Sequence, residues 1–404
     1  MRLFLALPIF LNSLLVGAAG LASREHSRAT ENAQPAGFGQ AHATTNSPTD
    51  EKKQAIALIK AGNFEGAAGR LKALQNAYPS DISIRIILVD AYFKAGMNSE
   101  GDAETQHALN SPALSQSEGL ELAKALIDDR QQEAAQKVLA AVTAKWPDSA
   151  PAHAQLGVLL SAKGQYEEAV WQLGRAVQLQ PGSSDYAQAL AEVLLSWRHY
   201  STALDFVTAE EQRFGELPDL EYCHAFALYG LRRHDEALAK LHALLDKHPR
   251  FDRAYSLLGT CYLDLGDAQK AAASFRKAIE LNPGNPRSYI SLAEVLRRNP
   301  QTTDEAISDA RKGLRLDPAS SEGKIQLALC YESKREYAQA QSLLQEVTQA
   351  HPELIPPHRI LARIYHQQGD FSKAEREGKI AASLEARQQK PAPAVPPAPR
   401  IDSK

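Results

Sequence analysis

The chain has 404 residues, of which 45 are basic and 48 acidic. This near balance provides no basic field for nucleic acid or an anionic membrane, so neither is expected as a partner. The three cysteines are too few for a disulfide scaffold. Alanine, leucine, glutamine, glutamate and lysine are abundant, and they favour helices because they lose little rotamer freedom there.

The first 22 residues have the pattern of a secretory signal peptide. Arg2 precedes an apolar run over 3–16, and small residues follow over 17–22. The alternative is a membrane anchor, but the run is shorter than the about 20 apolar residues that a bilayer-spanning helix needs. We expect cleavage after Ala19 or Ala22, no integral membrane segment in the mature protein, and export to a bacterial periplasm or out of the cell.

Two polar or proline-rich segments flank the rest of the chain. Residues 23–47 are rich in His, Thr, Gln and Asn, and they bury too little apolar surface to order themselves, so a flexible leader is expected. Residues 390–404 begin with KPAPAVPPAPR, which predicts an extended, disordered tail. Residues 48–389 follow one repeating pattern.

Small residues recur through this central region with a spacing of 34. When the repeats are aligned from Pro48, with one inserted residue before Ser321, two positions are nearly always alanine or glycine. Two antiparallel helices approach closely only where both carry almost no side chain, so each repeat is predicted to be a helical hairpin. The eighth position holds Ala55, Val89, Ala123, Gly157, Ala191, Ala225, Gly259, Ala293, Ala328 and Ala362. The twentieth holds Ala67, Gly101, Ala135, Ala169, Ala203, Ala237, Ala271, Ala340 and Ala374, with Ala306 at a site shifted by one residue.

Glycine and proline mark the ends of the predicted helices. Glycine adopts the positive φ that a helix end often needs, and proline stops a helix because it lacks a backbone N–H. The glycines between paired helices are Gly62, Gly96, Gly164, Gly266 and Gly369, and the prolines that close repeats are Pro79, Pro147, Pro181, Pro249, Pro283, Pro318 and Pro352.

Two segments carry a family resemblance. LGVLLSAKGQYEEAVWQLGRAVQLQP (Leu156–Pro181) and LGTCYLDLGDAQKAAASFRKAIELNP (Leu258–Pro283) resemble the tetratricopeptide repeat motif. The resemblance implies an all-α, right-handed superhelical solenoid of about ten helix-turn-helix repeats. It also implies that the first helices of successive repeats line a concave surface that holds peptides. The motif is specific for the fold and says little about the biochemical role.

The sequence contains no recognised catalytic or metal-binding pattern. There is no HExxH motif, no phosphate-binding GxxxxGK[ST] loop and no GxSxG nucleophile elbow. We therefore expect no enzymatic activity, no metal and no cofactor. Cys223, Cys261 and Cys330 are interpreted as small buried residues, and a bridge between Cys223 and Cys261 is the alternative that an exported compartment would permit.

The concave surface holds the candidate ligand site. In the family, the second, fifth, ninth, twelfth and thirteenth positions of a repeat face this surface. Acidic residues occupy several such positions early in the chain, and aromatic and then basic residues occupy them later, the composition of binding hot spots. In the alternative, the aromatic rings pack against the neighbouring repeat and the arginines are solvated. The acidic residues are Asp90, Asp128, Asp185 and Glu192, and the candidate ligand-binding residues are Tyr222, Phe226, Tyr229, Arg253, Arg287 and Arg297.

These observations favour a non-catalytic scaffold that binds proteins or peptides. Envelope assembly and polysaccharide export are settings suggested by analogy alone. One alternative is a glycan-binding solenoid, in which the three aromatic candidates and Trp197 would stack on sugar rings. Another is an accessory subunit of an enzyme complex that holds a catalytic partner.

Overall fold

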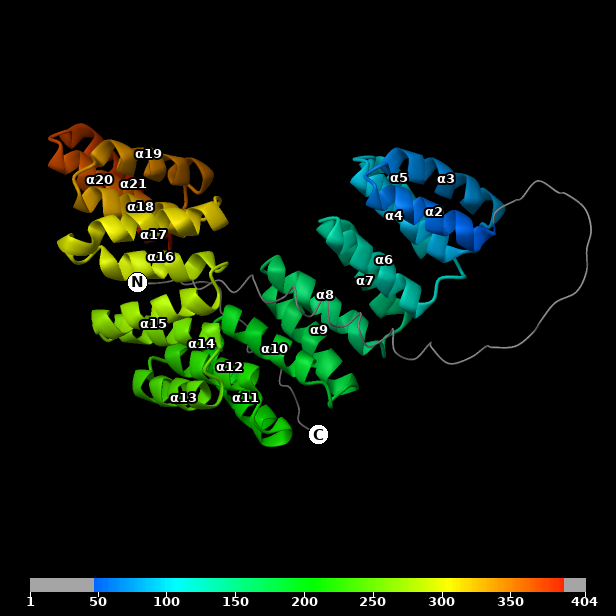
Figure 1. The fold of residues 1–404 in the computed structure, drawn as a ribbon, viewed down its shortest axis with the longest axis horizontal. Helices are drawn as coiled ribbons and strands as arrows, with labels where there is room; N and C mark the ends of the chain where they lie inside the picture. Colours follow the sequence, from blue (N-terminus) through cyan, green and yellow to red (C-terminus); the bar gives the residue numbers. More distant parts are fainter. Residues whose placement is uncertain (1–46, 389–404) are drawn as a thin grey trace, which may run out of the picture. The chain divides into compact units, whose positions relative to one another are not determined.

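The computed structural model describes residues 47–388 (Figure 1). The predicted signal peptide, nearly all of the predicted leader and the tail lie outside the described residues. Residues 47–388 form twenty α-helices and one short 3-10 helix and contain no strand, which confirms the all-α prediction. No helix within this range is long and apolar enough to cross a membrane.

The described residues fall into two compact units, which we call the N-terminal unit (47–197) and the C-terminal unit (198–388). In the N-terminal unit, first helices of repeats alternate with second helices. The first helices are α2 (Pro48–Lys60), α4 (Ile82–Lys94), α6 (Gln116–Asp128), α8 (Ala150–Ala162) and α10 (Ser184–Ser196), and the second helices are α3 (Phe64–Ala77), α5 (Asn98–Leu109), α7 (Gln132–Lys145) and α9 (Tyr166–Leu179).

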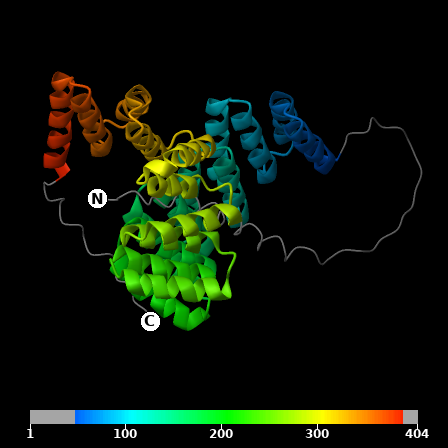
Figure 2. The ribbon, with the colours of Figure 1, turned by 60° about the vertical axis from the view of Figure 1, so that its left-hand side comes forward.

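The C-terminal unit begins with α11 (Tyr200–Phe214) and continues with five helical hairpins, stacked in chain order from α14 to α19 in Figure 1. Figure 2 shows the last pair, coloured orange-red to red, as two antiparallel helices. Before α17 lies the 3-10 helix η1 (Pro300–Thr302). The first helices are α12 (Pro218–Gly230), α14 (Asp252–Asp264), α16 (Pro286–Leu296), α18 (Ser321–Ser333) and α20 (Ile355–Gln367), and the second helices are α13 (His234–Lys247), α15 (Ala268–Leu281), α17 (Thr303–Leu316), α19 (Tyr337–Ala350) and α21 (Phe371–Gln388).

Polar caps set where many first helices begin. The side chains of Ser149, Ser183 and Ser320 each accept a hydrogen bond from a backbone N–H in the first turn of the following helix. Such a bond satisfies one of the donors that lack a partner within the helix. Proline stands in the first turn of α12 and α16, where its missing N–H removes no helical hydrogen bond. Many of the hairpins therefore begin at a position that the local sequence specifies.

The small residues lie where paired helices touch, as the spacing predicts. Ala169 and Ala271 are fully buried. A Cβ added to Gly259 would lie 2.8 Å from the ring of Phe275 on the partner helix. At Gly157 the added Cβ would lie 2.7 Å from Leu173 Cγ and 3.0 Å from the carbonyl oxygen of Ala169. A larger residue at any of these positions would push the two helices apart.

The turns between paired helices adopt a left-handed backbone conformation. All five glycines predicted at these turns have positive φ, for example +85° at Gly266. In four other repeats the same fifteenth position is an arginine with φ between 60° and 65°, which the sequence pattern did not predict. A residue with a Cβ is less stable in this conformation by about 1–2 kcal/mol. These arginines are Arg130, Arg198, Arg232 and Arg335.

Replacing Ala271 by leucine tests the helix contact in the seventh repeat. Overpacking a closely packed core position typically costs about 1–3 kcal/mol, and in a repeat array the damage should be local. Ala271→Leu should therefore increase hydrogen exchange in α14 and α15 before the rest of the C-terminal unit. The matched control is Ala268→Leu, which changes an exposed residue of the same helix. Equal protection in the two variants would contradict the assigned contact.

Candidate ligand-binding face

The first helices of the C-terminal unit pack in succession and present one row of side chains, which we call the first-helix face. It consists of the residues at the fifth, ninth and twelfth positions of α12, α14, α16, α18 and α20, with the flanking second and thirteenth positions. All six candidate residues from the sequence lie on these helices or directly after α16. Their burial and hydrogen bonds differ strongly from one helix to the next.

The aromatic residues of α12 are packed rather than presented to solvent. Tyr222 is 8% and Phe226 is 3% exposed. The Phe226 ring centroid lies 6.2 Å from that of Tyr222 and 6.1 Å from that of Tyr229, and Tyr222 also contacts Phe251 at 5.9 Å. Such tilted and edge-to-face pairs stabilise buried aromatic clusters. The burial of Tyr222 and Phe226 therefore favours the packing alternative over an exposed aromatic patch.

Arg253 belongs to the same packed cluster. It is 7% exposed, its Nη1 donates to Asp219 Oδ1 at 2.8 Å, and its guanidinium carbon lies 4.3 Å from the Tyr222 ring centroid. A cation over an aromatic ring with a carboxylate beside it is a stable arrangement within one protein. Tyr229 is the more accessible ring, and its hydroxyl donates to Asp264 Oδ2 at 2.9 Å. Arg253 and Tyr229 thus join the sixth repeat to the seventh.

The remaining arginines of the face alternate with acidic residues. Burial raises the pKa of Glu322, and nearby Arg287 partly offsets this effect. Burial lowers the pKa of Arg297, whose Nε donates to Gln326 at 3.3 Å. Arg363 makes a two-pronged contact with Glu332, with both hydrogen bonds at 2.6 Å. The face is therefore mixed in charge, whereas the sequence predicted basic residues at its later positions.

An apolar strip on α18 lies among these charges and was not among the sequence candidates. Ile325 and Leu329 occupy the fifth and ninth positions, one helical turn apart, and both are half-buried against the core. Helix α16, with Arg297 after its end, flanks α18 on one side, and α20 with Arg363 flanks it on the other. Aliphatic residues at these two positions are the sequence signal that could have revealed the strip.

Acidic residues of the first helices in the N-terminal unit fall into two groups. Asp128 and Asp185 are exposed, whereas Glu192 is 4% exposed and accepts a hydrogen bond from Gln188 at 3.1 Å. Asp90 forms an ion pair with Lys94, and Lys94 Nζ lies 3.7 Å from Asp129 Oδ1. Burial, followed by repulsion from Asp90, raises the pKa of Asp129 to about 6. The second and third repeats thus share one cation between two carboxyl groups.

The cysteines are buried thiols within the helical packing. Burial raises the pKa of Cys261 to about 12 and that of Cys330 to about 11. Cys261 is a free thiol, so the alternative bridge to Cys223 is not formed in this structure. Thiols with such raised pKa values are poor nucleophiles at neutral pH. No group of three or more His, Cys, Asp or Glu side chains suited to a metal ion occurs within residues 47–388.

The stacked hairpins, their small-residue contacts and their left-handed turns define a helical-repeat protein. Family models agree with this class. The tetratricopeptide repeat model matches residues 120–186, 224–286 and 262–321, and a second tetratricopeptide repeat model matches 325–353. The model for subunit 3 of the anaphase-promoting complex, or cyclosome, matches 162–244. The chain belongs to the tetratricopeptide repeat family.

Individual relatives match only part of the chain or match at low identity. The Hsp70-Hsp90 organizing protein of Triticum aestivum is 29% identical over 135 residues, which are 30% of this chain and 22% of the relative. Superkiller complex protein 3 of Mus musculus is 29% identical over 123 residues, 30% of this chain and 8% of the relative. A solved structure of the human IFIT1 dimer with m7Gppp-AAAA has 14% identity and a TM-score of 0.47, covering 85% of this chain and 91% of that one. The matches to the Hsp70-Hsp90 organizing protein and to Superkiller complex protein 3 span less than a quarter of the length of each.

Truncating Phe226 tests whether the aromatic cluster belongs to the core. A buried phenylalanine changed to alanine typically costs about 3–5 kcal/mol, so Phe226→Ala should lower the urea midpoint of the C-terminal unit strongly. Phe371→Ala is the control, because Phe371 is 63% exposed in the same unit and its truncation should change the midpoint little. A stable Phe226→Ala protein that lost ligand binding would instead support the original role for this ring.

Asp129 should make stability depend on pH in a defined direction. Its folded-state pKa of about 6 lies above the unfolded value of about 3.9, so the unfolded chain loses this proton first as the pH rises. The contribution of Asp129 to stability therefore falls between about pH 4 and pH 6. Asp129→Asn should raise the urea midpoint at pH 7 and have little effect at pH 4. The exposed neighbour provides the control Asp128→Asn, and an identical pH response in both variants would contradict this mechanism.

Proposed function

We propose that this protein is a non-catalytic scaffold that binds peptide segments of partner proteins on α16, α18 and α20. The family supports the binding class, because first helices of tetratricopeptide repeats commonly hold peptides. The proposed location of the peptide-binding site rests on one observation. Ile325 and Leu329 are half-buried and lie beside charged residues of both neighbouring helices. An apolar centre with a polar rim is the arrangement of protein interaction sites.

The chemistry of the face suggests which peptides it takes. Aliphatic side chains of the peptide would cover Ile325 and Leu329, and polar backbone groups would meet the guanidinium of Arg297 and the Arg363–Glu332 pair. Because acidic and basic groups alternate, net peptide charge contributes less than apolar contact. We expect binding of moderate affinity with a modest dependence on salt.

The cellular setting of this scaffold is also a proposal. The signal-like pattern of residues 1–22 supports export to a periplasm or out of the cell, with envelope assembly or polysaccharide export as candidate roles by analogy. Peptide mapping of the purified mature protein would find its first residue near Ser23 if the signal is removed. The role of accessory subunit in an enzyme complex would use the same peptide-binding face.

Glycan binding is less supported than protein binding. Sugar recognition by stacking needs an exposed ring face, and Tyr222 and Phe226 are both buried. Trp197 and Tyr229 are half-buried. The apolar strip on α18 contains no aromatic residue and is therefore better suited to aliphatic side chains of a peptide than to a sugar ring.

The test is peptide selection followed by substitution of the strip. The full chain would be screened against a phage-displayed random peptide library, and affinities of enriched peptides would be measured by fluorescence polarisation. Leu329→Gln should weaken them about tenfold or more, since it places an amide in the apolar centre of the contact. Leu316→Gln is the control, because Leu316 is 47% exposed on α17 and outside the first-helix face.

A second variant separates binding from folding. Leu329 also contacts the core, so thermal melting of Leu329→Gln must be compared with that of Arg363→Gln, whose side chain is 54% exposed. Arg363→Gln should weaken the peptides while lowering the melting temperature less than Leu329→Gln does, because the Arg363 side chain is the more exposed of the two. Failure to enrich any peptide, or equal affinity in the two variants and in the control, would refute the proposed face.

A further inference from the structure

Arginines replace glycine at several left-handed turns although the backbone requirement is the same. In the sixth repeat, Arg232 N donates to the carbonyl of Tyr229 at 2.9 Å, and Arg233 N donates to that of Leu228 at 3.0 Å. The seventh repeat has the same pair of hydrogen bonds around Gly266. This motif places its central residue in the left-handed region, which glycine adopts without steric cost. The turn by itself therefore gives no reason for an arginine side chain.

The three such arginines of the C-terminal unit are Arg198, Arg232 and Arg335. All three are exposed, and none forms an ion pair with a carboxylate anywhere in the part of the chain that the structure describes. Arginine offers a planar fork of donors that matches a carboxylate. The guanidinium donors of these side chains are therefore available to a carboxylate of a ligand.

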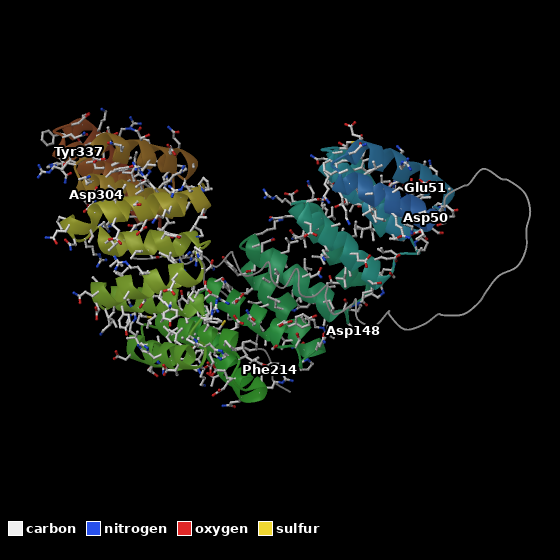
Figure 3. The ribbon with its side chains drawn as sticks, viewed as in Figure 1. Asp50, Glu51, Asp148, Phe214, Asp304 and Tyr337 are labelled. Carbon is white, nitrogen blue, oxygen red and sulfur yellow. The ribbon has the colours of Figure 1, made fainter. Side chains whose placement is uncertain are left out.

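Three acidic residues near these turns are already paired with other cations. Glu236 is held by Arg233 at 2.6 Å, and Asp267 is held by Lys270 at 3.0 Å. Asp304, which is labelled in Figure 3, lies 2.6 Å from Lys334. These three carboxylates therefore have partners other than the turn arginines.

The turns follow one another along one edge of the C-terminal unit. Gly230, at the end of α12, lies so close to Tyr200 at the start of α11 that an added Cβ would be 2.3 Å from the ring. The Tyr229–Asp264 hydrogen bond joins the sixth turn to the seventh. At the seventh turn Leu265 is 49% exposed. We call this surface the turn edge, and it consists of Arg198, Arg232, Leu265 and Arg335.

We propose that the turn edge binds an acidic segment of a partner protein. The first helices from α12 to α20 are in successive contact, and packed helices lie about 8–10 Å apart, so the three repeat steps from Arg232 to Arg335 span roughly 27 Å. An extended segment at about 3.3 Å per residue covers this length with about eight residues, and further residues of the segment would reach Arg198. Carboxylates of the segment would meet the guanidinium forks, and one aliphatic side chain would cover Leu265.

An anionic membrane and the helix dipole each fit these arginines less well than an acidic segment does. A membrane would contact a broad surface around the turns, whereas a single extended segment needs only the row of turn arginines. Cations near a helix C-terminus also interact favourably with the helix dipole. Lysine or arginine in the last helical turn would provide that interaction without the left-handed conformation, so the dipole does not require arginine at this position.

Poly-L-glutamate is the probe for the turn edge. The full chain should bind it at low salt, and the triple variant Arg198→Gly, Arg232→Gly, Arg335→Gly should bind it at least about tenfold more weakly, because three charge-assisted contacts are lost. The variant should melt at or above the wild-type temperature, since glycine suits these turns. The matched control is Arg250→Gln, Arg315→Gln, Arg376→Gln, which removes the same charge from exposed arginines outside the turn edge.

The outcomes separate the turn edge from a general charge effect and from a membrane. Strong binding by the control triple variant and weak binding by the glycine variant would support the turn edge. Equal weakening in both variants would show an effect of net charge and overturn it. Sedimentation of the wild-type chain with phosphatidylserine vesicles, without binding of poly-L-glutamate, would also overturn it in favour of a membrane. Leu329→Gln should keep poly-L-glutamate binding, so this result does not depend on the peptide-binding face.

Discussion

The close approach of paired helices at alanine and glycine is the constraint on which the structure depends. At Gly157 and Gly259 there is no room for a single additional carbon beside the partner helix. Because this contact recurs at the same two positions, each hairpin has nearly the same geometry and stacks on the next in the same way. The first helices then present an aligned face, and the turns an aligned edge, within the C-terminal unit. Both proposed binding surfaces follow from this repetition.

Charge within the C-terminal unit is arranged mainly to join neighbouring repeats. Arg253 is held between Asp219 and the Tyr222 ring, and Arg363 of the tenth repeat binds Glu332 of the ninth. A buried cation such as Arg253 needs such a partner, because removing charge from water is costly. Arginines on the first helices are thus largely committed to the fold. The exposed apolar surface between them becomes the more informative sign of a ligand.

The arginines in the left-handed turns differ from those on the first helices. These side chains extend from the ends of hairpins into solvent, where no neighbouring helix needs them. The same position is glycine in five repeats of this chain, so the local fold permits the residue that would be less strained. Retaining a strained residue where an easier one suffices is a common feature of functional positions. The contrast between glycine and arginine turns becomes visible when the fifteenth positions of all repeats are compared.

The sequence by itself determined the class of fold, the repeat length and the positions of helix contacts. Ala271 and Gly259 could be predicted as contact residues because a period of 34 sets small residues against one another whatever surrounds them. Tertiary structure alone decided which residues of the first helices are available to a ligand. The same position of a repeat is buried at Phe226 and half-exposed at Leu329, because its exposure depends on the side chains that the two neighbouring repeats place beside it. The repeat period specifies the position of a residue on its helix, whereas packing between repeats determines whether solvent can reach its side chain.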